Sequence, residues 1–257
     1  MTERTAEIER LLATCTVEER RAIFNLLRRE FPIHTIEAML NIEAEIILDA
    51  ISRSDDLTVR GVRGVIAQAA FALDVVGGLW DWRDITQGEN LPYDFLLTDG
   101  HGDVRVQVKM QRQKNQRPMM ANEGHRILSP NMYVVETQRT RGGKDASGAD
   151  TRPYRFGEFD ILAVAMHPST GSWKVFMYTV ARWLLPRPEN PSLLLKFQPV
   201  ARVPNDEWTG DFLTAVAWLR SGLDKQIRST DPDSESKARE QHHLTPHHYD
   251  DLEEKGR

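Results

Sequence analysis

The sequence is poor in cysteine and has no long hydrophobic run. Its 257 residues include a single cysteine, Cys15, which excludes an intrachain disulfide and a cysteine-rich zinc site. The longest apolar run falls far short of the roughly 20 residues that a membrane-spanning helix needs. The first ten residues are polar and acidic, so they lack the apolar core of a secretory signal peptide. These absences predict a protein with no membrane segment, and the cytoplasm is its expected location.

An excess of positive charge is also lacking overall, because the formal net charge is −5. Its distribution is uneven, however. Residues 105–155 contain eleven Lys and Arg against four acidic residues, whereas the first sixty residues contain eight Arg against twelve acidic residues. A positive stretch of this kind fits a surface that follows the phosphates of a nucleic acid. It fits equally well a solvated face with a flexible loop.

The N-terminal region has helical patterns. Residues 16–31 form an amphipathic pattern that Thr16 can cap and that Pro32 ends. Two shorter patterns, 35–40 and 43–52, loosely fit a helix-turn-helix. The second of these is acidic and has no basic residue until its end. Because acidic side chains repel phosphate, a structural or dimerising role is favoured over the reading of DNA.

The remainder of the chain mixes strand and helix patterns. We expect helices over 62–76 and 206–219 and strands over 93–98, 103–109, 132–137, 159–166, 173–178 and 197–203. The predicted fold class is α/β, with a mixed β-sheet of about five strands flanked by helices. We expect an N-terminal helical region over 1–58, a main domain over 59–222 and a disordered charged tail over 223–257. We interpret the two His pairs of this tail as part of a flexible His-rich segment in preference to a metal site.

A predicted hairpin brings three functional side chains together. In the segment 103–109, apolar Val104, Val106 and Val108 alternate with polar residues, the period-2 pattern of a half-buried strand. Gln107 and Lys109 therefore project from the same face. The turn sequence 99–102 joins this strand to the run that contains Asp94. An acid, an amide and an amine at one edge can make a site for a hard cation and an activated water.

These residues carry a resemblance to a known family. Pro92-Tyr93-Asp94 followed by Gln107-Val108-Lys109 resembles the motif of the PD-(D/E)XK nuclease superfamily, to which restriction endonucleases belong. The glutamine is similar to the variant half-motif of its Mrr-type group. The resemblance extends over roughly residues 62–180, and it implies a restriction-endonuclease-like fold. This sequence departs from the commoner pattern at Tyr93, which stands between Pro92 and Asp94, and at Gln107, where Asp or Glu is usual.

The resemblance implies a catalytic set and a metal ion. Asp94, the amide oxygen of Gln107 and the backbone carbonyl of Val108 would hold Mg²⁺, and Lys109 would orient or help to deprotonate the attacking water. Because Gln107 is neutral, the site should hold the metal more weakly than a site with two carboxylates. Glu136 is a candidate to compensate, and Gln68 stands where many relatives have a helix glutamate.

The same resemblance implies DNA as the partner and, because two strands are cut, a homodimer. The acidic N-terminal helices are the candidate dimer surface. Arginine and lysine near amide and hydroxyl side chains suit contacts to phosphates and base edges. The candidate DNA-binding residues are Arg112, Lys114, Arg139, Arg141, Lys144, Arg152 and Tyr154.

The sequence thus predicts a metal-dependent endonuclease of the restriction type that hydrolyses duplex DNA. One alternative is a non-catalytic DNA-binding regulator, which the glutamine at position 107 favours and the acidic 43–52 segment disfavours. Another is a repair or junction-resolving nuclease with the same core.

Overall fold

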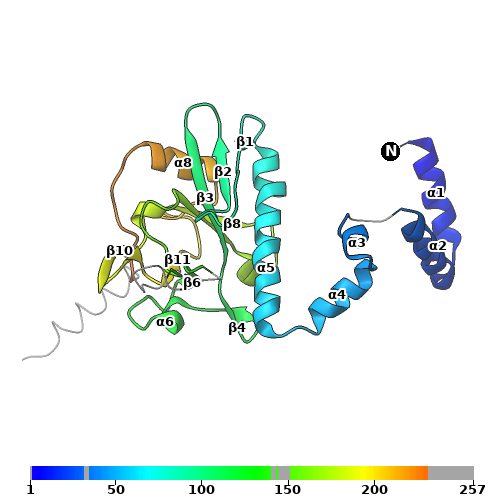
Figure 1. The fold of residues 1–257 in the computed structure, drawn as a ribbon, viewed down its shortest axis with the longest axis horizontal. Helices are drawn as coiled ribbons and strands as arrows, with labels where there is room; N and C mark the ends of the chain where they lie inside the picture. Colours follow the sequence, from blue (N-terminus) through cyan, green and yellow to red (C-terminus); the bar gives the residue numbers. More distant parts are fainter. Residues whose placement is uncertain (1, 32–34, 140–142, 144–150, 231–257) are drawn as a thin grey trace, which may run out of the picture. The chain divides into compact units, whose positions relative to one another are not determined.

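The computed structural model describes most of the chain and divides it into two units, Met1–Arg60 and Gly61–Arg257 (Figure 1). The division lies close to the boundary expected between residues 58 and 59. The described residues are 2–31, 35–139, 143 and 151–230.

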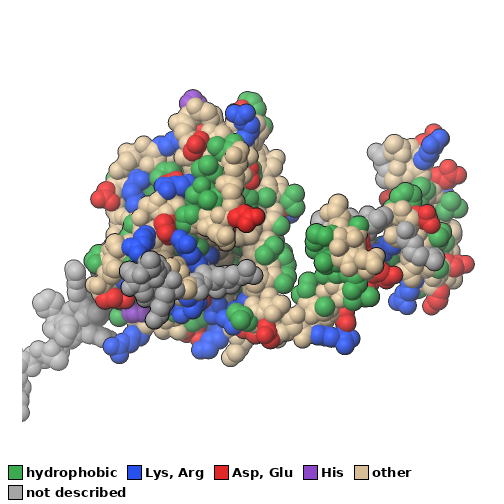
Figure 2. Space-filling view, in the orientation of Figure 1, with side chains coloured by type: hydrophobic (Ala, Val, Ile, Leu, Met, Phe, Trp, Pro, Cys, Tyr) green, Lys and Arg blue, Asp and Glu red, His purple; other side chains and the backbone are tan. Residues whose placement is uncertain are grey.

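The first unit is made of helices. They are α1 (Glu3–Thr14), α2 (Val17–Glu30), α3 (Thr35–Leu40) and α4 (Ala44–Ser52). The predicted cap of α2 is confirmed: Thr16 and Glu19 form a reciprocal capping box, in which each side chain accepts a hydrogen bond from the backbone N–H of the other. Helix α1 was not predicted. No residue of α1, α3 or α4 is buried, and Figure 2 shows their apolar side chains at the surface of this unit.

The central sheet of the second unit has five strands in the order β1-β2-β3-β7-β8. Strands β3 and β7 are parallel, and the other neighbouring pairs are antiparallel. The prediction of a mixed α/β fold with a sheet of about five strands is therefore confirmed. The strands are β1 (Arg83–Asp84), β2 (Phe95–Thr98), β3 (Asp103–Met110), β7 (Ile161–Ala165) and β8 (Phe176–Val180).

Helices cover one face of this sheet. Helix α5 (Asp56–Ala70) continues into a π-helical turn at Phe71–Val75, and α8 spans Phe212–Arg220. The valines of β3 point to this face and pack with Phe71 and Phe212 in one core cluster. Because side chains alternate along a strand, Gln107 and Lys109 of β3 point to the opposite face.

The opposite face is covered mainly by irregular chain and small sheets. The strand expected over 132–137 is present as β6 (Tyr133–Glu136), but it pairs with β11 (Phe197–Val200) in a separate two-stranded sheet and not in the central sheet. A second core lies here, around Leu162, Trp183 and Trp208. The remaining elements are β4 (Gln113–Lys114), β5 (Arg117–Pro118), α6 (Ala121–Gly124), α7 (His167–Thr170), β9 (Pro186–Arg187) and β10 (Asn190–Leu194).

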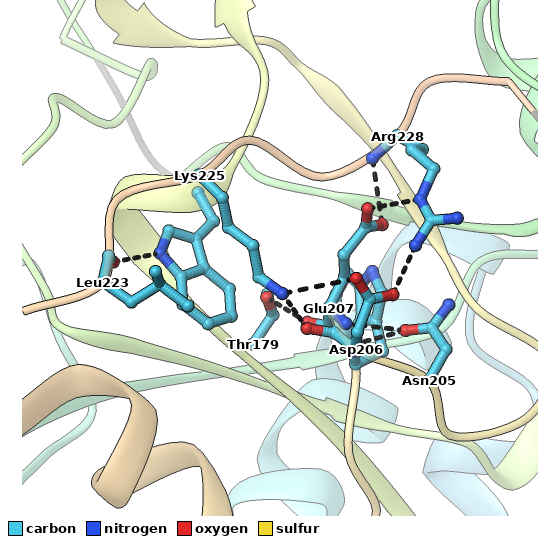
Figure 3. A network of polar contacts seen from close by, with 9 residues as sticks. Thr179, Asn205, Asp206, Glu207, Leu223, Lys225 and Arg228 are labelled. Atoms are coloured by element: carbon cyan, nitrogen blue, oxygen red, sulfur yellow. Dashed lines mark hydrogen bonds and ion pairs between the residues drawn. The ribbon is translucent and has the colours of Figure 1, made fainter. Parts of the chain in front are cut away.

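The segment 223–230 packs on this second core, which corrects the expectation that the disordered tail begins at residue 223. Ile227 is buried, and its N–H donates to the Trp183 carbonyl. Arg228 pairs with Glu207, and Lys225 contacts Asp206 (Figure 3). An apolar anchor and two ion pairs hold a segment whose composition alone is typical of a tail. The rest of the expected tail, from residue 231, lies outside the described residues.

This segment supplies a test of stability. Glu207 is 4% exposed and accepts hydrogen bonds from the backbone N–H and the Nε of Arg228, at 3.0 and 2.6 Å. Replacing Glu207 by glutamine removes the charge and one acceptor, and should lower the free energy of unfolding by about 1 kcal/mol. Chemical denaturation followed by tryptophan fluorescence measures the change. The control is Glu189→Gln, because Glu189 is exposed and lies 3.8 Å from Arg187; an equal loss in both variants would contradict the assignment.

Among the residues that the structure describes, no helix is both long enough and apolar enough to cross a membrane.

Candidate functional site

The hairpin of β2 and β3 places Asp94 directly beside Gln107. Its register pairs Phe95 with Val106, so Asp94 lies opposite Gln107, and the Asp94 N–H continues the ladder by donating to the Val106 carbonyl at 2.9 Å. The predicted hairpin is therefore confirmed, with its turn at 99–102. Asp94 is half-buried, and the surrounding backbone fixes where its carboxylate lies.

The Asp94 carboxylate accepts three hydrogen bonds. The Gln68 Nε2 donates to Oδ1 at 2.7 Å, and the Val108 N–H donates to Oδ2 at 2.8 Å. The Gln107 Nε2 makes a short contact with the same Oδ2. Gln68 reaches the site from α5, so the helix residue that the resemblance pointed to does lie against the aspartate.

The side-chain amide of Gln107 is the centre of the site. This residue is only 3% exposed. Its Nε2 lies between the Asp94 carboxylate and the Val108 carbonyl oxygen, to which it also donates at 3.2 Å. Its Oε1 accepts a hydrogen bond from the Tyr154 hydroxyl at 3.2 Å. All polar atoms of the amide thus have partners within the protein.

Lys109 joins this group through Tyr154. Its Nζ donates to the Tyr154 hydroxyl at 3.1 Å and to the Gln138 carbonyl at 3.2 Å. The same Nζ lies 5.0 Å from the centroid of the Tyr154 ring, a cation–π distance. The three predicted catalytic residues are thus gathered in one network, although Asp94 and Gln107 touch each other and Lys109 reaches them through a tyrosine.

Burial dominates the electrostatics of the site. It raises the pKa of the Asp94 carboxyl, against the opposing effect of the Lys109 charge and the Val108 N–H. It lowers the pKa of the Lys109 ammonium, against the opposing effect of Asp94 and Glu136. Burial also raises the pKa of the Tyr154 hydroxyl, with the charge of Asp94 adding to it. A proton is therefore easier to remove from this lysine than from an exposed one.

The donor set fits a hard cation in one respect. The Asp94 carboxylate and the Val108 carbonyl oxygen both contact the amide nitrogen that lies between them. If the Gln107 amide were turned over, three oxygens would face one point, and Mg²⁺ prefers oxygen ligands. The described residues contain no group of three or more His, Cys, Asp or Glu that could hold a metal. The fit thus depends on one carboxylate and two neutral oxygens.

Most of the predicted DNA-binding side chains that can be placed are already paired with acids. Arg112 lies 3.4 Å from Glu136, Lys114 lies 3.7 Å from Glu123, and Arg139 lies 2.7 Å from Glu158. Arg152 is exposed. Figure 2 shows basic and acidic side chains interspersed on the face drawn. Arg141 and Lys144 lie outside the described residues.

Two expectations about this region need correction. Tyr154 was expected at the DNA surface, but it is 4% exposed and its hydroxyl points to Gln107 and Lys109. Glu136 was considered as a compensating ligand, but it lies on β6 and pairs with Arg112 and Lys196. The positive charge counted over 105–155 is also reduced by acids just beyond it, since Glu158 pairs with Arg139 and Asp160 pairs with Arg105.

Sequence reasoning did not assign Tyr154 its place in the site. It lies far along the chain from Gln107, in a segment whose Tyr154 carbonyl accepts a hydrogen bond from the N–H of Leu194, the last residue of β10. No spacing or periodicity in the sequence indicates this contact. The backbone carbonyl of Gln138 was missed for a similar reason, because a carbonyl has no residue-type signal.

Comparisons with protein-family models and with curated proteins gave no match. Among solved structures, the chain is similar to a bacterial homing endonuclease, I-Ssp6803I, at 17% sequence identity and a TM-score of 0.37. The alignment covers 63% of this chain and 94% of that one. Similarity at this level does not establish a shared fold, so the function proposed below is built on the site residues.

Proposed function

We propose that the protein is a metal-dependent DNA endonuclease of the restriction type. The observation that carries the proposal is the contact of Gln107 Nε2 with both the Asp94 carboxylate and the Val108 carbonyl, with Lys109 linked to the same group through Tyr154. An acid, an amide, a carbonyl and an amine from one hairpin are the groups that phosphodiester hydrolysis by such a site requires.

Each residue has a chemical task. Asp94, Gln107 and the Val108 carbonyl would hold Mg²⁺, which when bound supplies positive charge to the phosphate and to an attacking water. Lys109, whose pKa burial lowers, orients this water and, as the neutral amine, accepts its proton. The ammonium that this transfer forms then stabilises the negative charge that develops on the phosphate.

The proposed substrate is duplex DNA and the proposed assembly is a homodimer, since a two-strand cut needs two sites. Arg152 is an exposed basic side chain among the described residues 151–155 and is a proposed phosphate contact. Arg112 and Arg139 could exchange their present carboxylate partners for phosphates, because guanidinium binds both groups through the same geometry.

The direct test is incubation of the purified chain with plasmid DNA in Mg²⁺, with a matched incubation in EDTA. Discrete fragments in Mg²⁺ alone support the proposal. Asp94→Asn is the matched control, because it keeps the shape of the side chain and removes its charge, and it should be inactive. A gel shift without any product would support a DNA-binding regulator instead, and a preference for branched DNA would support a junction-resolving nuclease.

A further inference from the structure

The hydrogen bonds of the site run in one direction. The Lys109 Nζ donates to the Tyr154 hydroxyl, the hydroxyl donates to the Gln107 Oε1, and the Gln107 Nε2 donates to the Asp94 carboxylate. Each group thus donates toward the anion and accepts from the side of the cation. Chains of this kind strengthen their members, because each donated bond polarises the next.

The direction of the chain determines how the Gln107 amide is turned. In the arrangement observed, its nitrogen faces the oxygens of Asp94 and Val108. The reversed amide would place its own oxygen against those two oxygens, and without a cation between them this contact is repulsive. With a cation the preference inverts, because the amide oxygen is a ligand and the NH₂ group is not. The amide therefore has one orientation that excludes a cation and one that accepts it.

We infer that Tyr154 is a positioning residue that holds the Gln107 amide in the orientation that excludes the cation, so that it weakens metal binding. The inference rests on the proposed metal site. The Tyr154 hydroxyl already accepts from Lys109, so its own hydrogen is directed to an acceptor, and the Gln107 Oε1 is that acceptor. In the reversed orientation the amide NH₂ group would face the Tyr154 hydroxyl oxygen, which already accepts a hydrogen bond from the Lys109 ammonium.

Tyr154 is fixed in this position by its surroundings. Its ring packs edge-on against Phe159 with 5.4 Å between centroids, and the Arg139 Cζ lies 5.5 Å from its ring centroid. The Leu194 N–H donates to its carbonyl at 2.9 Å. Since ring and backbone are both held, the hydroxyl cannot leave Gln107 without a wider movement. The other amide at the site, Gln68, contacts the opposite oxygen of Asp94 and does not set this orientation.

The test is a direct measurement of metal affinity in Tyr154→Phe. This variant keeps the ring and its packing and removes only the hydroxyl, which leaves the Gln107 Oε1 without its donor. Mn²⁺ is the probe, and titration of the full chain followed by electron paramagnetic resonance gives the dissociation constant. We expect Tyr154→Phe to bind Mn²⁺ about fivefold more tightly than the unaltered chain, the effect of one net hydrogen bond.

The matched control is Tyr178→Phe. Tyr178 is also a buried tyrosine, at 3% exposure, but it belongs to the core on the other face of the sheet. Loss of the Tyr178 hydroxyl should leave the affinity for Mn²⁺ unchanged. Equal or weaker binding in Tyr154→Phe would overturn the inference and leave the proposed function standing. If neither the unaltered chain nor Tyr154→Phe binds Mn²⁺, the metal site itself fails, and both the inference and the proposed function fall.

A second measurement uses the unaltered chain and so does not depend on the folding of a variant. In nitrogen-15 NMR spectra the side-chain NH₂ of Gln107, identified by its absence in Gln107→Glu, should exchange slowly with water because both of its acceptors lie within the protein. Diamagnetic Mg²⁺ should accelerate that exchange as the amide turns. Slow exchange that Mg²⁺ leaves unchanged would contradict the inference.

Discussion

Replacing Lys109 by methionine is expected to lower the rate of DNA cleavage by about a thousandfold, the effect of losing a positioned acid–base group. Methionine keeps an unbranched side chain of similar length, so the packing against Tyr154 survives while the amine is removed. The Gln138 carbonyl and the Tyr154 hydroxyl lose one donor, which should change thermal stability far less than activity. Single-turnover cleavage of a labelled duplex, with DNA binding measured separately, gives the rate.

The control for this substitution is Lys174→Met. Lys174 has a side chain that is 77% exposed and lies 3.5 Å from Asp74, outside the network of the site. It should cut DNA at the unaltered rate. Cleavage by Lys109→Met at a rate within a few-fold of that control would remove Lys109 from the catalytic set. The proposal would then lose the residue that activates water.

Replacing Gln107 by glutamate is expected to make the stability of the protein depend on Mg²⁺. The glutamate would set an oxygen against the Asp94 carboxylate and the Val108 carbonyl, where the Nε2 now donates. In EDTA this buried repulsion should lower the free energy of unfolding by about 2 kcal/mol. In Mg²⁺ the second carboxylate becomes a ligand, so stability should recover and metal binding should tighten by about tenfold. Thermal unfolding in EDTA and in Mg²⁺ measures both effects.

Gln198→Glu separates this effect from the general cost of a buried charge. Gln198 is also fully buried, and its Nε2 donates to the carbonyls of Leu185 and Leu195. A glutamate there should destabilise the protein to the same extent in EDTA and in Mg²⁺. If Mg²⁺ failed to restore the stability of Gln107→Glu, the oxygens of Asp94, Val108 and the new carboxylate would not form a cation site.

The hairpin could be predicted because its information is local. The alternation of Val104, Val106 and Val108 defines which face each residue occupies, and the turn at 99–102 defines which residues of the two strands meet. A shift by one residue would expose the valines, so the register follows from the pattern. The proximity of Asp94 and Gln107 is a consequence of that register.

Charge was predicted less well than strand register. A count over 105–155 includes the arginines of the region and omits the acids that pair with them from outside it, Glu158 and Asp160. The expected tail had a similar error, because the contact of Arg228 with Glu207 depends on a meeting of residues that are separated in the chain. Composition describes a segment by itself, whereas pairing depends on the partner that folding brings to it.

The order of residues along one hairpin was therefore enough to determine the sheet face, the register and the meeting of Asp94 with Gln107, because these follow from the two-residue period of a strand and the length of its turn. The tertiary structure alone decided that Tyr154 joins Lys109 to Gln107 and that the Gln107 nitrogen faces Asp94. Those contacts join the hairpin to a segment placed by packing against Phe159 and by pairing with Leu194. Such long-range contacts come from the packing of the whole domain, and no local period of the chain encodes them.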